Sequence, residues 1–336
     1  MLILFNIRNY LLTGVCMFYN LTMMCFGSIM GVIVIGIVGA LIISGFKQSS
    51  EAMGVLSKLF IRITLPCLVF SNMATKFRIG GIPMWWVFPL IGIVLFIAGA
   101  LLAYGYLALD RSVSFPGVFT ASVTFHNSIL LPLAFAPALF SGDKLPTFLN
   151  LLFLYNILTI PAFFTIGVWM VHTSSDKEYG IRDMVTPPTI ATILGLLFAV
   201  TGWHTYLPEW LMSQLSIFGS LSTPLSILIV GGVIVASFSK ITVSDWKDPL
   251  KIAFLKSIVL PVLATVYVIL VRPPEYMALF VIMGSVMPVS SVIAVVIPSD
   301  SAIQKTVAGS ILITYLASIV IVPVFLSIHG ILYGWM

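Results

Sequence analysis

The chain has 336 residues, of which 60% are hydrophobic and only 8% are charged. A soluble domain carries about 25% charged residues, so water is not the main solvent of this protein and no room is left for a separate soluble domain. The net charge of +5 is too small and too scattered to indicate a nucleic-acid-binding surface.

Apolar runs recur along the whole sequence. An α-helix needs about 20 such residues to cross a bilayer core, so the runs predict an all-α integral membrane protein with about ten transmembrane helices. The spans are expected at 26–46, 52–74, 83–108, 115–140, 145–171, 185–203, 210–238, 249–271, 275–298 and 301–333. Residues 1–25 are apolar but carry Arg8; they extend the first span, form another helix or precede it.

Lysine and arginine are distributed unevenly over the connections between these spans. Eleven of the 16 lie beside odd-numbered connections, four lie beside even-numbered ones, and Arg8 lies in the N-terminal segment, on the same side as those four. The positive-inside rule therefore predicts a multi-pass protein of the plasma membrane with both termini outside the cell. The same rule places the longest connection, residues 172–184, in the cytoplasm.

Three landmarks recur in the two halves of the chain. They are Pro66 and Pro224, Pro132 and Pro288, and Asp143 and Asp300, separated by 158, 156 and 157 residues. A unit of five crossings places its second copy upside down, so residues 26–171 and 185–336 are predicted to be two inverted five-helix repeats. The alternative is coincidence, because proline is common in membrane helices.

The fourth and ninth spans each combine proline with small polar residues. Proline removes a backbone donor and clashes with the preceding turn, so both helices are predicted to be broken and to cross near the midplane. Opened helix ends direct amide donors to a common centre and favour an anion. The candidate substrate-binding residues are His126, Asn127, Ser128, Pro132, Pro288, Ser290 and Ser291, together with Tyr155, Asn156 and Tyr315 of the fifth and tenth spans. Alternatively, such residues only join helices by hydrogen bonds.

The placement of charge narrows the function. All 11 acidic residues fall in or near the predicted loops, so no carboxylate is expected at mid-membrane to bind sodium or carry a proton. Histidine is the residue type whose ordinary pKa is closest to neutrality, so His126 leaves proton coupling open, and the alternative is a hydrogen-bonded structural histidine. The deepest cations, Arg62 and Lys256, are expected to extend toward the cytoplasmic interface or else to attract an anion. The four histidines are scattered, so no enzyme, metal site or cofactor is predicted.

Three segments resemble the auxin efflux carrier family, which includes plant auxin exporters and microbial dicarboxylate carriers. LFIRITLPCLVF, LSTPLSILIVGG and MPVSSVIAVVIPSD are similar to its second, seventh and ninth helices, and the resemblance spans about residues 27–330. It implies two inverted five-helix repeats, in which the first, second, sixth and seventh helices form a scaffold and the others an elevator-like transport domain.

The resemblance also implies carboxylate-bearing substrates, bound where the fourth and ninth helices cross. Asn127 matches the family's asparagine before the fourth-helix proline, although HNSILLP lacks the glycine usual before that proline. Family members are often dimers through the scaffold helices, so the resemblance also implies a homodimer.

Residues and resemblance together predict a secondary active or facilitative carrier that moves a small organic anion, a carboxylate, by alternating access in the efflux direction. The alternatives are a sodium- or proton-coupled organic-anion symporter and a membrane sensor that binds without transporting. The expected partners are the anion, the lipid bilayer and a second copy of the chain, and nucleic acid is not expected.

Overall fold

The structure, a computed structural model, describes residues 19–334 apart from 20–21, 24–25, 28–29, 32–33, 43–44, 46–48, 77–83, 141, 143, 174–184, 239–242 and 298–300. Most of the N-terminal segment 1–25 and of the predicted cytoplasmic connection 172–184 lies outside these residues. The repeat landmarks Asp143 and Asp300 lie outside them as well.

Helices dominate the described part of the chain. The first half contains α2 (Ser49–Leu59), the π-helical turn η1 (Phe60–Thr64), α3 (Leu65–Lys76), α4 (Val87–Leu109), α5 (Pro116–Thr124), α6 (Leu130–Leu139), α7 (Lys144–Ala162), the π-helical turn η2 (Phe163–Gly167) and α8 (Val168–His172). The second half contains α9 (Pro187–Thr201), η4 (Trp203–Tyr206), α10 (Glu209–Ser220), α11 (Ser222–Phe238), η5 (Val243–Trp246), α12 (Lys247–Phe254), the π-helical turn η6 (Leu255–Val259), α13 (Leu260–Val271), α14 (Glu275–Val286), α15 (Ile293–Val296) and α16 (Ser301–Tyr333).

Six helical stretches in the described residues are long and apolar enough to cross a membrane. They are Gly54–Lys76, Val87–Leu109, Lys144–His172, Glu209–Ile229, Lys247–Val271 and Ala302–Tyr333. Pro187–Thr201 and Glu275–Val286 are shorter apolar helices. The prediction of an all-helical, multi-pass membrane protein is confirmed, whereas the number of ten spans and the inverted repeat stay predictions.

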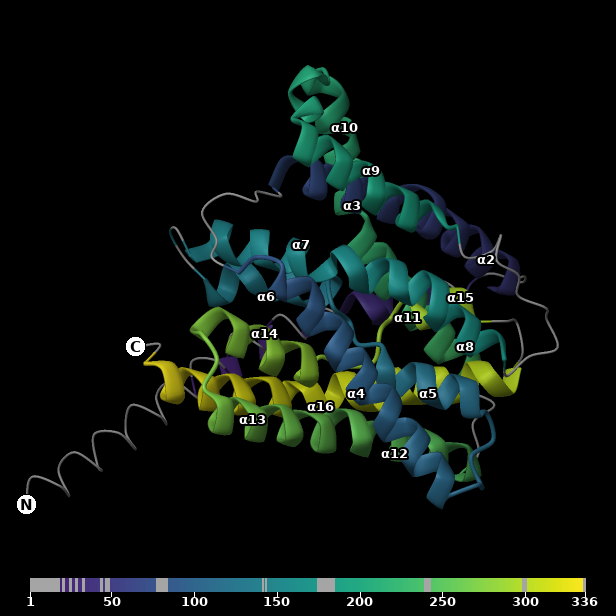
Figure 1. Cartoon of the computed structure of the whole chain (residues 1–336). Coiled ribbons are helices and arrows are strands. Elements are labelled where there is room, and N and C mark those ends of the chain that lie inside the picture. Colours follow the sequence, from purple (N-terminus) through teal and green to yellow (C-terminus); the bar gives the residue numbers. More distant parts are fainter. Residues whose placement is uncertain are drawn as a thin grey trace, which may run out of the picture.

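The helices fall into two groups. In the first helix group, α3 packs against α9 and α10 and continues the line of α2 and η1. In the second helix group, α4 packs against α5 and α14, while α16 packs against α12, α13 and α14. Figure 1 shows α3, α9 and α10 on one side of the molecule and α4, α5, α12, α13, α14 and α16 on the other. Helices α7 and α11 lie between the groups, since α7 contacts α4 and α9, and α11 contacts α2 and α16.

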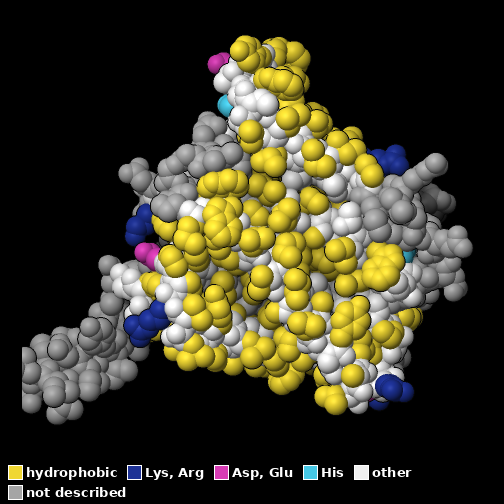
Figure 2. Space-filling view, in the orientation of Figure 1, with side chains coloured by type: hydrophobic (Ala, Val, Ile, Leu, Met, Phe, Trp, Pro, Cys, Tyr) yellow, Lys and Arg dark blue, Asp and Glu magenta, His cyan; other side chains and the backbone are white. Residues whose placement is uncertain are grey.

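Hydrophobic side chains cover the outer surface of the helices. Leu101 of α4 is 66% exposed and Leu270 of α13 is 77% exposed, which is unfavourable in water and favourable against lipid. In Figure 2 the yellow hydrophobic side chains fill the visible face, and the coloured charged side chains lie toward its edges. This distribution agrees with a belt of lipid around the helices.

An ion-pair group ties together the ends of two helices. Lys251 Nζ of α12 lies 2.8 Å from Asp110 Oδ2, just after α4, and 3.4 Å from Asp248 Oδ1. The hydrogen bond from Lys251, assisted by Ser112, holds the pKa of Asp110 below its usual range. Ionised Asp110 is therefore better stabilised in the folded chain than in the unfolded chain.

The lowered pKa of Asp110 predicts a loss of stability in acid. Because the pKa falls on folding, the contribution is complete above the unfolded carboxyl pKa of about 3.9 and is lost as the pH drops through the folded value. We expect the melting temperature of the purified protein to fall below about pH 4. The fall should be smaller in Asp110→Asn, and an identical pH profile for both proteins would contradict the assignment.

Candidate functional site

The fourth predicted span is interrupted, and a proline explains where. Helix α5 ends at Thr124 and α6 begins at Leu130. Pro132 lies in the first turn of α6, where a missing N–H is tolerated, but its ring would clash with the carbonyl of Ser128 in a continuous helix. The predicted break is present, and it precedes the proline.

The ninth predicted span is interrupted in a similar way. Helix α14 ends at Val286 and the short α15 begins at Ile293. Met287 adopts an extended conformation with φ −64° and ψ 138°, as is usual for a residue before proline, here Pro288. The second predicted break is therefore present as well.

The two unwound segments touch and pair with each other. The N–H of Asn127 donates to the carbonyl of Pro288 at 2.9 Å, and the N–H of Ser290 donates to the carbonyl of Phe125 at 3.1 Å. Together these bonds form an isolated antiparallel bridge. Backbone groups that lack helical partners are costly within a membrane, so this mutual pairing stabilises the crossing.

Asn127 connects the crossing to two helices. Its Oδ1 atom accepts hydrogen bonds from the N–H groups of Leu130 at 3.1 Å and Leu131 at 3.2 Å, and so caps the start of α6. Its Nδ2 atom donates to Tyr315 Oη of α16 at 2.7 Å. The sequence predicts free amide donors at this helix end, but the structure shows that Asn127 already engages some of them.

A second polar group joins the crossing to α7. Ser128 Oγ donates to Asn156 Oδ1 at 2.7 Å, and Asn156 Nδ2 donates back to the Ser128 carbonyl at 3.0 Å. Thr159 Oγ1 also donates to Asn156 Oδ1 at 3.0 Å. Thr159 was not predicted, although its position three residues after Asn156 places both side chains on one helix face.

His126 forms a third contact with α7. Its Nε2 atom lies 2.7 Å from Tyr155 Oη, within hydrogen-bond distance, and its ring meets the ring of Phe96 edge-on at 5.1 Å. All three side chains are buried. Gly284 of α14 leaves room for this pair, because a Cβ atom there would lie 2.6 Å from Tyr155 Oη.

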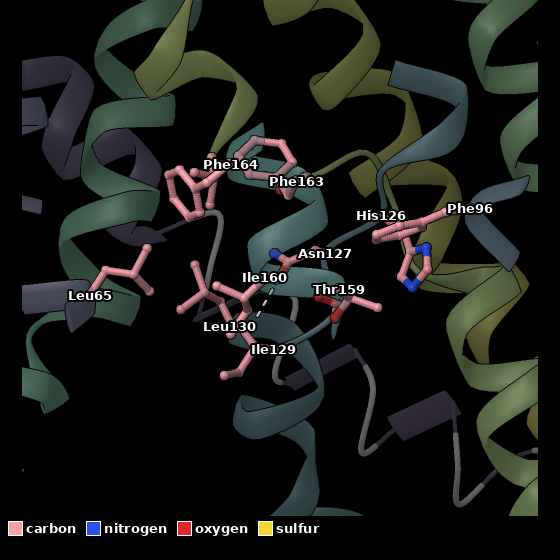
Figure 3. A pocket seen from close by; sticks show the side chains of 13 residues that line it. Leu65, Phe96, His126, Asn127, Ile129, Leu130, Thr159, Ile160, Phe163 and Phe164 are labelled. Carbon is pink, nitrogen blue, oxygen red and sulfur yellow. Dashed lines mark hydrogen bonds between the residues drawn. The ribbon is translucent and has the colours of Figure 1, made fainter. Parts of the chain in front are cut away.

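A small cavity of about 30 Å³ lies at the crossing. Polar and apolar residues line it: Leu65, Phe96, His126, Asn127, Ser128, Ile129, Leu130, Thr159, Ile160, Phe163, Phe164, Ser290 and Val292. Figure 3 shows Asn127 near the middle, with Leu65, Phe163 and Phe164 toward one side and His126 beside Phe96 on the other. Leu65 comes from the first helix group, so the cavity lies where that group meets the crossing.

The structure divides the ten predicted site residues into two sets. Those that line the cavity are His126, Asn127, Ser128 and Ser290. Those that belong to the surrounding helices and segments without lining it are Pro132, Pro288, Ser291, Tyr155, Asn156 and Tyr315. The sequence does not predict the aromatic and aliphatic walls of the cavity. It also does not predict Thr314, whose Oγ1 accepts from the N–H of Val289 at 3.3 Å.

The two deep cations behave differently. Arg62 in η1 is exposed. Lys256 in η6 is 0% exposed, so the expectation that it extends to the membrane interface is wrong. Both cations lie in π-helical turns, so the turn itself does not explain the difference, and the packing of η6 against α4, α5, α14 and α16 accounts for the burial of Lys256.

The chemistry at the crossing is neutral hydrogen bonding beside a helix N-terminus. Among the described residues, no carboxylate lines the cavity, and no three His, Cys, Asp or Glu side chains gather as a metal cluster. The positive end of α6 points toward the crossing, which favours a negative ligand over a positive one. Such a site can bind and orient a small molecule.

Comparison with known families gives a match over nearly the whole chain. The family described as "membrane transport protein" matches residues 24–178 and 170–326. Comparison with curated proteins gave no match.

Proposed function

The chain belongs to the membrane transport protein family, as its resemblance to the auxin efflux carriers predicts, and from this premise we propose that it is a carrier of a small organic anion. The substrate carries a carboxylate. Transport is secondary active or facilitative and runs outward across the plasma membrane by alternating access. The protein is not an enzyme, and its first helix group serves as a scaffold through which two copies form a homodimer.

The observation that carries this proposal is the paired crossing of two unwound segments at the contact between the helix groups. In transporters, broken helices of this kind form the substrate site near the midplane, and access alternates as one group of helices moves against the other. Here the crossing lies in the second helix group, and Leu65 of the first group closes one wall of the cavity. Movement between the groups would open the cavity.

The size of the cavity supports such a movement. Its volume of about 30 Å³ is close to the space of one water molecule, whereas sites for organic ligands measure about 300–1,000 Å³. An organic acid can therefore enter only if the walls separate. The first wall to move would be α3, because Leu65 contributes a side chain from outside the crossing.

The preference for an anion follows from the charges at the crossing. The α6 N-terminus supplies a partial positive charge, and the residues lining the cavity include no acid. We expect the protein to bind ionised acids and to ignore the matching amides, because the amide lacks the charge that the helix end stabilises.

Uptake into proteoliposomes tests this expectation. The probes are labelled malate and labelled indole-3-acetate, and the competitors are the same acids without label and the matching amides, indole-3-acetamide and malamide. We expect the unlabelled acids to compete with the labelled ones and the amides to compete at least about tenfold less well. Protein-free liposomes correct for passive entry of the weak acids.

The same assay separates the alternatives. Binding of labelled acid in detergent without uptake or counterflow in liposomes would identify a sensor. Uptake that requires an inward sodium gradient would identify a sodium-coupled symporter. If neither acid is bound or transported, or if amides compete as well as acids, the carboxylate-carrier proposal is wrong.

A further inference from the structure

Lys256 is the most deeply buried charged side chain in the described part of the chain. Its side chain is 0% exposed, and its Nζ atom has no hydrogen-bond partner among the described residues. Asp248, which is also buried, lies 3.4 Å from Lys251 in an ion pair. An unpaired ammonium inside a membrane protein is unfavourable, so a lysine in this position needs a functional explanation.

The backbone around Lys256 departs from a regular α-helix. It lies in the π-helical turn η6, shortly before Pro261, which has no N–H to donate to the preceding turn. The turn η1 shows the same arrangement, with Arg62 shortly before Pro66. Because Arg62 is exposed and Lys256 is buried, only Lys256 can act on a buried site.

The surroundings of η6 connect Lys256 to the crossing. The turn packs against α4, α5, α14 and α16, and α5 and α14 are the helices that lead into the unwound segments. His126, two residues after the end of α5, lines the cavity and contacts Tyr155, so the turn that carries Lys256 packs against a helix that ends at the candidate site.

Other charged groups near η6 are either paired elsewhere or placed toward helix ends. Lys251 pairs with Asp110 and Asp248, and Lys305 lies 3.2 Å from Asp245. Among the helices packed against η6, α5 carries no titratable side chain and leads into His126. The titratable side chains on the other helices are Tyr104 and Tyr106 on α4, Lys247, Asp248 and Lys251 on α12, Tyr267 on α13, Glu275 and Tyr276 on α14, and Lys305, Tyr315, His329 and Tyr333 on α16. No described acidic residue forms an ion pair with Lys256.

Resting on the proposed anion transport, we propose that Lys256 carries one proton together with each anion, so that the protein is an anion–proton symporter. In this cycle Lys256 is a neutral amine while the site is empty. When a carboxylate enters the crossing, the lone pair of Nζ takes a proton from water on that side, and no bond to the substrate forms. After the site opens to the opposite side, the anion leaves and the ammonium returns its proton to the water there.

Thermodynamic linkage explains why protonation of Lys256 and binding of the anion occur together. An anion near Lys256 favours its charged form, and by reciprocity the charged form raises the affinity for the anion by the same factor. His126 is less suited to hold a second proton, because two positive charges around one buried crossing repel each other. Lys256 and His126 together therefore hold one proton. With a monocarboxylate bound, the charges of the ammonium and the anion sum to zero.

The experiment uses purified full-length protein in proteoliposomes, with labelled malate and labelled indole-3-acetate as probes. We expect an acidic outer solution to increase uptake by wild-type protein about fivefold or more. Probe entry should also acidify the lumen, as reported by an enclosed pH-sensitive dye. Protein-free liposomes supply the background for both signals.

Two variants assign the proton to Lys256. Lys256→Arg keeps a permanent positive charge, so counterflow exchange should survive and stimulation by the pH gradient should vanish. Uptake of the monocarboxylate indole-3-acetate, which is electroneutral with one proton, should become sensitive to a valinomycin-imposed potential. Lys256→Gln removes the charge, so the apparent affinity should fall about tenfold or more without loss of thermal stability. Arg62→Gln is the matched control and should behave like wild-type protein.

The outcomes distinguish this proposal from the one on which it rests. Uptake of acid by wild-type protein without a response to the pH gradient would overturn proton coupling and leave the carrier proposal intact. Coupling that persists in Lys256→Arg but disappears in His126→Gln would assign the proton to His126 and overturn the role of Lys256. If the Lys256 variants misfold, the test is made on wild-type protein in weakly buffered detergent. Adding the probe should then cause the protein to take up protons, and the absence of proton uptake overturns the proposal. If wild-type protein moves neither acid, both proposals fail.

Discussion

Replacing Asn127 with alanine is expected to reduce transport at least about tenfold and to lower the free energy of unfolding by about 1–3 kcal/mol. The variant loses the oxygen that accepts from Leu130 and Leu131 and the amide that donates to Tyr315. The α6 end and the Tyr315 hydroxyl then lose partners in a buried region. Sequence alone predicts a loss of binding without a loss of stability, and the observed contacts change that expectation.

Asn127→Asp separates the two effects. A carboxyl group keeps the acceptor for the α6 N–H groups, and it can accept a hydrogen bond from the Tyr315 hydroxyl, so the melting temperature should stay close to that of wild-type protein. Its negative charge repels an anionic substrate, so uptake should still fail. Melting curves and uptake are measured on the same preparations.

A buried asparagine elsewhere provides the control. Asn72 of α3 donates only within its own helix, to the carbonyl of Leu68 at 2.7 Å. Asn72→Ala should therefore retain uptake. If Asn127→Ala matches Asn72→Ala in both stability and uptake, Asn127 does not organise the site.

The two helix breaks could be predicted from sequence because their cause is local. A proline ring excludes the helical conformation a few residues upstream, whatever the rest of the fold does. The chain therefore opens before Pro132 and beside Pro288, as the sequence predicts. The apolar spans were predictable for a similar reason, since each depends on the composition of one continuous segment.

The partners of the site residues could not be predicted in the same way. Asn127 and Tyr315 are 188 residues apart, and His126 and Tyr155 are 29 residues apart. Such pairs depend on how whole helices cross. The sequence indicates only that these residues belong to one polar centre. The apolar walls of the cavity carry no distinguishing signal at all, because phenylalanine and leucine occur in every span.

Lys256 shows why the position of a charge along a span is not enough. A lysine seven residues into a helix ordinarily extends its flexible side chain toward the interface. Both deep cations lie in a π-helical turn, but the packing of η6 against α4, α5, α14 and α16 encloses Lys256, and such contacts between distant segments leave no mark in the hydrophobic pattern of one span. The proline that follows both η1 and η6 is a local signal for such a turn, but it does not say which cation faces inward.

Replacing Gly284 with alanine is expected to disrupt the contact between His126 and Tyr155. The new Cβ atom would lie 2.6 Å from Tyr155 Oη and 2.6 Å from Leu95 Cδ1. Leu95 can rotate, but the Tyr155 ring can move away only by breaking its hydrogen bond to His126. We expect a loss of about 1–3 kcal/mol in the free energy of unfolding, typical of overpacking, together with a large loss of uptake.

Gly105→Ala is the matched control for this change. Gly105 also lies within a helix, α4, but a Cβ atom there meets nothing within 4 Å. Alanine favours a helix by about 1 kcal/mol over glycine, so Gly105→Ala should be as stable as wild-type protein or more stable and should retain uptake. Tyr155→Phe removes the hydroxyl without crowding the site, and it should reproduce the transport defect of Gly284→Ala with a smaller loss of stability. If Tyr155→Phe transports normally while Gly284→Ala does not, crowding against Leu95 and the crossing causes the defect, and the contact between His126 and Tyr155 is dispensable.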